Sequence, residues 1–462
     1  MTVLAPPAEG FDVSVPLLIV GAGGAGLCAA LAAADLGVEC MILERDKRPG
    51  GNTALSTGLI PGAGTGMQKA AGIDDAPDIF LADVVKKTHD GVDMAVARRL
   101  TDESAATIEW LVDRHGIGLT LLPDLHYPGH SRPRMHGTVN RNGAELHDEL
   151  MAAVSRAGVE IVTEARVTRL YAAEDGTIRG VEITRPDGTL EQLGCDAVLL
   201  ACNGFGGNRD LIRQYIPSLD GVQYLGHPSN QGEAALFGEA LGAKLEDMGA
   251  FQGHGSINLV SGQPMWNCMT INGIQVNLSG ERFSNEAQGY SEQALRVLGQ
   301  PEGVAFGIFD QRGHDLGLDT LEYRQGVKIG AVKRAETVEE MAAMTGLPVE
   351  ALTATIADVV GLAKGGGTCR FGRKFANTPA LEAPFYLARV TGAYFHTQGG
   401  LAVDEDARVL RPDGSAFPNL FAAGGAARGL SGPGDWGYLS GNGLWSATTL
   451  GRLGGTAAAR QI

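Results

Sequence analysis

Residues 15–44 read VPLLIVGAGGAGLCAALAAADLGVECMILE, and this stretch decides the fold. The continuous apolar run Val15–Val20 is typical of a strand that is buried on both faces. Leu27–Leu36 is rich in good helix formers, and a second apolar strand follows at Cys40–Leu43. Strand, glycine-rich turn, helix and strand in this order predict a βαβ unit that binds a dinucleotide.

The glycines of the turn have the spacing G-x-G-x-x-G. Gly21 allows the tight turn, Gly23 lets the backbone approach a pyrophosphate, and Gly26 lets helix and strand pack closely. The helix that follows offers N–H groups and partial positive charge to phosphates. Glu44 ends the second strand, where a carboxylate accepts hydrogen bonds from ribose hydroxyls. The unit therefore predicts a nucleotide cofactor.

Length and charge limit the other possibilities. The chain has 462 residues, and since single cores stop growing at about 250–300 residues, we expect two domains. The formal net charge of −16 argues against nucleic acid and against anionic lipid as partners. We find no signal peptide, and no uncharged apolar run approaches the roughly 20 residues of a membrane span. We expect a cytoplasmic protein.

The six cysteines exclude several kinds of redox chemistry. No two of them form a C-x-x-C pair, so neither disulfide-reductase chemistry nor an iron–sulfur or c-type haem site is expected. Most lie in apolar runs, where a free cysteine acts as a small hydrophobic side chain. This usage fits a reducing compartment, and we expect no metal site.

The order of elements predicts an α/β protein. We expect a discontinuous Rossmann-like domain, residues 1–248 and 398–462, with an inserted α+β cap, residues 249–397, for the substrate. Within these domains we expect amphipathic helices at 78–115 and 144–157, a small sheet at 158–202, a loop at Gly365–Gly367 and a C-terminal helix from about Leu444.

Two further stretches carry a family resemblance. Gly50–Gly58 reads GGNTALSTG and Pro418–Gly425 reads PNLFAAGG. With the βαβ unit, they make the chain similar over nearly its full length to the FAD-dependent fumarate reductase/succinate dehydrogenase flavoprotein superfamily. The resemblance implies FAD. Membrane-bound members attach FAD through a His in the first stretch, where this chain has Asn52, so we expect non-covalent FAD.

The resemblance also implies a set of FAD contacts. They lie in the glycine-rich turn, after the second strand, along the first stretch, at the third nucleotide contact and near the C-terminus. We expect them at Gly21, Gly23, Gly24, Ala25, Gly26, Glu44, Arg45, Gly51, Asn52, Thr53, Ser56, Thr57, Gly58, Val167, Asn203, Gly204, Gly424, Gly425, Gly441, Asn442, Gly443 and Leu444.

The fumarate reductases of this superfamily bind substrate through two His and two Arg. His254, in Gln252-Gly253-His254, resembles the family's Q-x-H, and His396 opens a run that resembles its H-T-x-G-G. The positions of the two Arg hold Tyr290 and Tyr438 instead. Since tyrosine cannot bind a carboxylate bidentately as a guanidinium does, a dicarboxylate loses its main anchors.

Tyrosines at these positions resemble the 3-ketosteroid Δ1-dehydrogenases of the superfamily. The resemblance implies that Tyr438 and a backbone N–H near Gly441 polarise a ketone, while Tyr290 removes the α-proton and the β-carbon delivers hydride to flavin N5. The product is an enone, and the reverse reduction is open to the same site. Tyr127 is a candidate third tyrosine that supports the base, or else a surface-loop residue.

Alternatives remain at this point. A reductase of an unsaturated carboxylic acid would keep both His, although it would lack the Arg pair, and a flavin-binding electron-transfer subunit without turnover is a third possibility. Candidates to pair with a substrate carboxylate are Arg282, Arg296 and Arg428, with Arg134 and His136 as further candidates to face the site. The electron acceptor, the exact substrate and the oligomeric state stay open.

Overall fold

The computed structural model describes residues 2–125 and 127–462, which form two compact units. The larger unit consists of Met1–Asp220, Gly226–Phe251 and His396–Ile462, and the smaller of Gly221–Leu225 and Gln252–Phe395. The boundaries differ by a few residues from those expected at 249 and 397. The segment Gly221–Leu225 joins the smaller unit because it pairs with the chain at Tyr394, which donates to Gln223 O at 3.1 Å and accepts from Leu225 N at 2.9 Å. The assignment of the units to FAD and substrate stays a prediction.

The main sheet of the larger unit is mostly parallel around its centre. Among the described residues its strands run in the order β1-β8-β9-β10-β2-β3-β7, with β19 beside β10 and β18 beside β19. The neighbours of β2, which are β10 and β3, are both parallel to it. Its strands are β1 (Thr2–Leu4), β2 (Ser14–Val20), β3 (Cys40–Leu43), β7 (Glu160–Val162), β8 (Arg166–Ala172), β9 (Ile178–Thr184), β10 (Leu190–Leu200), β18 (Arg408–Leu410) and β19 (Ala416–Ala422).

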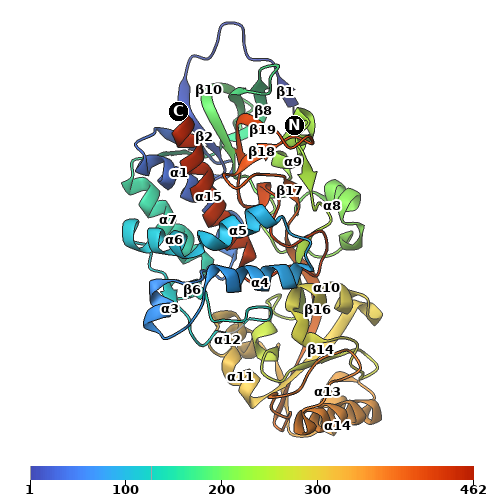
Figure 1. Cartoon of the computed structure of the whole chain (residues 1–462). Coiled ribbons are helices and arrows are strands. Elements are labelled where there is room, and N and C mark those ends of the chain that lie inside the picture. The colour runs from blue at the N-terminus through green and yellow to red at the C-terminus, as the bar shows by residue number, and fades with distance from the viewer. Residues whose placement is uncertain (1, 126) are drawn as a thin grey trace. The chain divides into compact units, whose positions relative to one another are not determined.

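Smaller sheets and helices complete this unit (Figure 1). The short strands are β4 (Ile60–Pro61), β5 (Thr120–Leu121), β6 (Met135–Gly137), β11 (Leu245–Glu246) and β17 (Gly400–Leu401). The helices are α1 (Gly24–Asp35), α2 (Gly51–Leu55), α3 (Gly66–Ala70), α4 (Pro77–Thr88), α5 (Met94–Asp102), α6 (Ser104–Glu109), α7 (Gly143–Arg156), α8 (Arg209–Tyr215), α9 (Glu233–Leu241) and α15 (Asn442–Gln461). The predicted βαβ unit and α/β fold class are confirmed.

Helices α1 and α15 run side by side (Figure 1) and pack through small residues. A Cβ atom on Gly451 would lie 2.3 Å from Ala25 O, and one on Gly455 would lie 2.3 Å from Ala29 O. Glycine at these two positions of α15 therefore allows its backbone to touch that of α1. This contact ties the C-terminal helix to the helix that opens the βαβ unit.

The smaller unit is an α+β structure. Its sheet has the order β12-β16-β14-β13 among the described residues, with β15 beside β16. The strands are β12 (Phe251–Asn258), β13 (Ile274–Val276), β14 (Val304–Asp310), β15 (Lys333–Ala335) and β16 (Phe385–Thr397). The helices are α10 (Tyr290–Leu298), α11 (Gln311–Gly317), α12 (Leu321–Lys328), α13 (Val338–Thr345) and α14 (Val349–Gly365), with a 3₁₀ turn, η3, at Trp266–Met269.

Two local expectations need correction. The helical stretch 78–115 is interrupted between α4 and α5, because His89 and Asp90 both have positive φ and end the first helix. The expected loop at Gly365–Gly367 begins one residue later, because Gly365 is the last residue of α14 and Gly366 caps the helix in the left-handed conformation that glycine adopts without strain.

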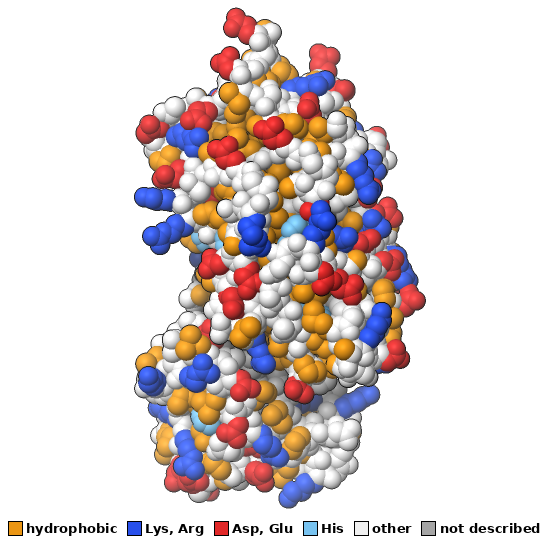
Figure 2. All heavy atoms as spheres, turned by 90° about the vertical axis from the view of Figure 1, so that its left-hand side faces the viewer, with side chains coloured by type: hydrophobic (Ala, Val, Ile, Leu, Met, Phe, Trp, Pro, Cys, Tyr) orange, Lys and Arg blue, Asp and Glu red, His pale blue; other side chains and the backbone are white. Residues whose placement is uncertain are grey.

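On the face shown in Figure 2, acidic and basic side chains are interspersed. None of the helices within 2–125 and 127–462 combines the length and apolar character needed to span a bilayer. The same ranges contain no group of three His, Cys, Asp or Glu side chains placed to hold a metal ion.

Candidate active site

A cavity of about 800 Å³ opens in the larger unit where β2, β3 and β10 end. Ligands of open α/β sheets bind at this carboxyl edge. Of the predicted FAD contacts, those that line the cavity are Gly21, Gly23, Gly24, Ala25, Glu44, Arg45, Gly51, Asn52, Thr53, Val167, Asn203, Gly424 and Gly425.

The glycine-rich turn leaves this cavity open for a pyrophosphate. A Cβ on Gly21 would lie 2.5 Å from Ala201 O, and one on Gly26 would lie 1.9 Å from Gly21 O, so both must be glycine. Gly23 N-caps α1 and has no side chain of its own to cap the helix, while Gly24 N–H donates to Thr53 Oγ1 at 2.9 Å. Helix N–H groups thus meet a cavity that a side chain would otherwise fill, and the residues fit a bound dinucleotide phosphate.

Glu44 lies buried at the edge of the cavity. Its two carboxylate oxygens accept hydrogen bonds from the backbone N–H groups of Ala22 and Asp46, each at 2.9 Å. These bonds fix the carboxylate, and each oxygen keeps a second lone pair for a ribose hydroxyl. The arrangement fits the role predicted for Glu44.

A second segment closes onto the first stretch at this cavity. Asn52 Oδ1 accepts from His227 N–H at 2.6 Å and from Asn230 Nδ2 at 3.0 Å. Arg45 donates to Ser229 O at 2.7 Å and to Glu233 at 2.6 Å. All six residues line the cavity, so polar contacts between two distant parts of the chain form its wall.

The remaining predicted FAD contacts lie outside the cavity lining, and their contact with FAD stays a prediction. Gly26 and Gly58 pack against backbone, and Gly204 packs against Thr397. The residues in this group are Gly26, Ser56, Thr57, Gly58, Gly204, Gly441, Asn442, Gly443 and Leu444.

Tyr438 is buried beside the start of α15. Gly443 N–H donates to Tyr438 Oη at 3.4 Å, and the His396 ring meets the Tyr438 ring edge to face at 5.4 Å between centroids. Burial raises the pKa of Tyr438, although the Gly443 N–H acts in the opposite direction. The tyrosine therefore stays protonated near neutral pH and is a hydrogen-bond donor, not a base. The N–H at this hydroxyl belongs to Gly443, whereas the sequence pointed to Gly441.

A chain of side-chain hydrogen bonds sets the tautomer of His396. Ser431 Oγ donates to Gln398 Oε1 at 2.6 Å, so the Gln398 amide nitrogen faces His396 and donates to its Nδ1 at 2.8 Å. Burial lowers the pKa of His396 to about 4. His396 is therefore neutral, and the shorter Gln398 contact favours the proton on Nε2, although Thr397 O also lies 3.4 Å from Nδ1.

In the smaller unit, Tyr290 is the first residue of α10 and lies against His254 of β12. Their rings stack with centroids 5.0 Å apart, and Trp266 meets Tyr290 edge to face at 6.2 Å. His254 Nδ1 accepts from Ser256 N–H at 3.2 Å, and burial lowers the pKa of His254 to about 3. Like His396, His254 is a neutral Nε2–H donor.

The arginines offered as carboxylate partners are mostly occupied. Arg282 makes a bidentate pair with the buried Glu286, with Nε–Oε1 at 2.9 Å and Nη2–Oε2 at 2.6 Å. Arg428 pairs with Glu246 at 2.9 Å and Asp247 at 2.6 Å. Arg282 and Arg428 are thus paired within the chain, which argues against a role as carboxylate partners of the substrate. Arg296 differs, because its Nη1 is buried without a hydrogen-bond partner in the described ranges.

Arg134 and His136 do not face the site either. Arg134 is fully buried between Asp75 and Asp83. His136 is bound by Thr65 Oγ1 at 3.1 Å and Arg134 O at 3.0 Å. Tyr127 is partly buried, and burial raises its pKa, so a supporting role for it stays a prediction.

Sequence reasoning missed the residues that orient these groups. Gln398 lies in the quoted His396 motif, so its position was a usable signal. Asp75, Asp83 and His130 lie in no motif, and only their contacts identify them.

The dinucleotide cavity at the carboxyl edge of a parallel sheet and an α+β unit inserted in the chain define a nucleotide-dependent oxidoreductase fold. The chain belongs to the FAD binding domain family, whose model matches residues 17–444, within the FAD-dependent fumarate reductase/succinate dehydrogenase superfamily. Its cofactor is FAD, and it is an oxidoreductase that acts on CH–CH bonds.

Three similar proteins show the range of this superfamily. Probable fumarate reductase Ifc3 of Shewanella frigidimarina (strain NCIMB 400) is 28% identical over 463 residues, which cover 98% of this chain and 76% of that protein. The solved structure of the open conformation of a flavocytochrome c3 fumarate reductase matches with a TM-score of 0.80 at 27% identity. The match covers 98% of this chain and 79% of that chain. A third match is the structure of 3-ketosteroid-Δ4-(5α)-dehydrogenase of Rhodococcus jostii RHA1 in complex with 4-androstene-3,17-dione. It has a TM-score of 0.78 at 26% identity, and the match covers 98% of this chain and 99% of that chain.

Proposed function

We propose that the protein desaturates a neutral ketone between its α and β carbons, or reduces the corresponding enone. The substrate is cyclic, either a steroid or a smaller monocyclic oxo compound. The observation that carries the proposal is the arrangement at Tyr438, whose protonated hydroxyl lies beside the Gly443 N–H and the neutral His396. These are neutral donors, which suit the uncharged oxygen of a ketone.

Tyr438 polarises the ketone. Because the pKa of its hydroxyl is raised by burial, it donates a hydrogen bond to the ketone oxygen and stabilises the enolate that develops there. Gly443 is the better candidate than Gly441 for the accompanying backbone donor, since its N–H lies 3.4 Å from Tyr438 Oη.

Tyr290 takes the α-proton. It is the first residue of α10, and its ring lies against His254 and Trp266. Bound FAD supplies the acceptor for the hydride of the β-carbon. In the reverse direction Tyr290 returns the proton as an acid.

The charges of the described residues support a neutral substrate. Both predicted substrate His are neutral, and Arg282 and Arg428 are paired with carboxylates of the chain. A dicarboxylate would need fixed cations where the chain has tyrosines. The ring cluster of His254, Trp266 and Tyr290 suits an apolar carbon skeleton.

A second candidate is the reduction of an unsaturated carboxylic acid. It is favoured by the 28% identity to a probable fumarate reductase and by the buried, unpartnered Nη1 of Arg296 on the same helix as Tyr290. In this reading Arg296 binds a single carboxylate.

Anaerobic mixing with saturated cyclic ketones, steroidal and monocyclic, tests the proposal through the flavin absorbance. We expect one ketone class to bleach the flavin. Tyr290→Phe should slow bleaching by about 10²–10⁴-fold with FAD still bound, because it removes the base. Tyr215→Phe, which changes a tyrosine bound to Glu239 on the surface, is the matched control and should bleach at the original rate.

The opposite pattern is equally clear. If no ketone bleaches the flavin, and the dithionite-reduced protein is reoxidised by unsaturated acids, the acid reductase replaces the ketone desaturase. Slower reoxidation in Arg296→Leu would then support Arg296 as the carboxylate partner.

A further inference from the structure

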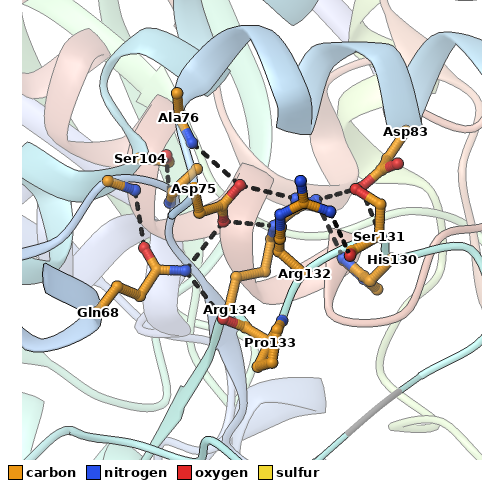
Figure 3. A network of polar contacts seen from close by, with 12 residues as sticks. Gln68, Asp75, Ala76, Asp83, Ser104, His130, Ser131, Arg132, Pro133 and Arg134 are labelled. Carbon is orange, nitrogen blue, oxygen red and sulfur yellow. Dashed lines mark hydrogen bonds and ion pairs between the residues drawn. The ribbon is translucent and has the colours of Figure 1, made fainter. Parts of the chain in front are cut away.

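A buried ion cluster surrounds Arg134 in the larger unit (Figure 3). Arg134 Nε and Nη2 donate to the two oxygens of Asp75, each at 3.0 Å, and Nη1 donates to Asp83 Oδ2 at 2.7 Å. The guanidinium also lies 4.5 Å above the Phe80 ring centroid. The Arg134 side chain has no exposed surface.

Other donors bind the same two carboxylates. Asp75 accepts from Gln68 Nε2 at 2.9 Å and from Ala76 N–H at 3.0 Å. Asp83 accepts from the N–H and the hydroxyl of Ser131 at 2.8 and 2.9 Å. Since burying charges usually costs as much as their pairing returns, a cluster of this kind is better explained by the geometry it fixes than by stability.

The contacts of this cluster extend from Arg134 to His130. Its Nδ1 lies 3.4 Å from Arg134 Nη1, and its Nε2 lies 2.9 Å from the carbonyl oxygen of Ser440. A guanidinium only donates and a carbonyl only accepts, so Nδ1 carries the lone pair and Nε2 the proton. Burial, assisted by Arg134, lowers the pKa of His130 to about 4 although Asp83 and Asp75 act in the opposite direction, which agrees with a neutral ring.

Ser440 belongs to the turn Tyr438–Gly443, which carries the candidate catalytic hydroxyl. On the other side of this turn, Asn442 Nδ2 donates to Leu430 O at 2.9 Å. The turn itself closes through Asn442 N–H to Leu439 O at 3.0 Å. His130 thus holds the turn from outside it, whereas Asn442 is a residue of the turn that ties it to Leu430.

We propose that His130, oriented by the Arg134 cluster, is a positioning residue that holds the turn Tyr438–Gly443 and thereby the Tyr438 hydroxyl against Gly443 N–H. This inference rests on the proposed function for its catalytic consequence. The contacts run from Asp75 and Asp83 through Arg134 to His130, and from there to Ser440.

Two substitutions separate the hydrogen bond from packing. His130→Gln retains an N–H donor for Ser440 O, whereas His130→Phe retains the ring that lies 6.0 Å from Phe80 but removes the donor. With a ketone that bleaches the flavin, we expect His130→Phe to lower the limiting bleaching rate by at least about 10-fold with little change in the ketone concentration at half-maximal rate. His130→Gln should restore most of the rate. Equal rates in both variants would overturn the inference.

Two measurements need no substrate. ¹⁵N NMR of labelled histidine should show His130, assigned by its loss in His130→Gln, with the proton on Nε2 from pH 5 to 8. Hydrogen exchange of peptides that contain Gly443 should accelerate in His130→Phe and not in His130→Gln. A proton on Nδ1, or unchanged exchange in His130→Phe, contradicts the positioning role. If the NMR and exchange results are as expected but no ketone bleaches the flavin, the proposed function is wrong, while the role of His130 in positioning the turn is still supported.

Discussion

At the scale of single residues, the candidate substrate residues of each unit are neutral donors. In the larger unit Tyr438 is buried and His396 is half-buried, and in the smaller unit His254 is buried. Burial keeps each of them in its neutral form near pH 7, because it raises the pKa of the tyrosine and lowers the pKa of the histidines. Arg282 and Arg428 are paired with carboxylates of the chain, whereas Arg296 Nη1 has no partner in the described ranges. Neutral donors recognise an uncharged polar atom better than a carboxylate, because they offer no bidentate cation.

Asn52 is the residue on which retention of FAD should depend. Its side chain holds the segment of His227 and Asn230 at the cavity through two hydrogen bonds. Asn52→Ala removes both, and at about 0.5–1.5 kcal/mol each we expect the Kd for FAD to rise by roughly 5–150-fold. Quenching of FAD fluorescence on titration into apoprotein measures this.

The matched control for Asn52 is Asn140→Ala. Asn140 is exposed, binds Glu145 and does not line the cavity, so its loss should leave the Kd unchanged. Unaltered FAD affinity in Asn52→Ala would show that the two hydrogen bonds do not hold the cavity closed.

At the scale of elements, the contact of α15 with α1 links the site to the cofactor. Helix α15 begins at Asn442, within the turn that carries Tyr438, and packs along α1, whose N-terminus opens onto the cavity. The two helices approach closely only because Gly451 and Gly455 have no side chain. The position of Tyr438 relative to the FAD cavity therefore depends on this helix pair.

Gly451→Ala should destabilise the protein. The added Cβ would lie 2.3 Å from Ala25 O, which forces the helices apart, and we expect a loss of about 1–3 kcal/mol in the free energy of unfolding. The same change at Gly361 in α14 meets nothing within 4 Å and should stabilise by about 0.4–1 kcal/mol. Urea unfolding of both variants measures the difference, and a neutral Gly451→Ala would contradict tight helix contact.

At the scale of the whole molecule, buried imidazoles make stability depend on pH. Burial lowers the pKa values of His130 and His136 in the larger unit from 6.5 to about 4. Between these values the unfolded chain binds protons that the folded chain does not. Stability is therefore complete above pH 6.5 and is lost as the pH falls toward 4.

His396, in the same unit, has its pKa lowered to about 4 as well, and we expect each of these three histidines to contribute up to about 1.4 kcal/mol per pH unit in that window. Urea unfolding at pH 6.5, 5.75 and 5 measures the slope, and His130→Gln should reduce it. His89→Gln, at an exposed histidine, should leave the slope unchanged. A flat profile over this range would mean that the buried rings are not neutral in the folded state.

The sequence by itself determined the βαβ unit from local spacing, and its resemblance to a known superfamily implied the FAD cofactor and the family. A buried strand, a G-x-G-x-x-G turn and an acidic strand end are contiguous, and their geometry needs no distant partner. The tyrosines at positions 290 and 438 were found in the same way, by counting from motifs. Their roles stay a prediction.

Only the tertiary structure decided which polar groups face each other. Arg282 and Arg134 looked like candidate ligands in the sequence, yet Glu286, Asp75 and Asp83 neutralise them. His130 contacts Ser440, 310 residues away along the chain. A buried polar group needs a hydrogen-bond partner, but the local sequence does not say which residue that partner is. At such separations the partner is set by how helices and sheets pack.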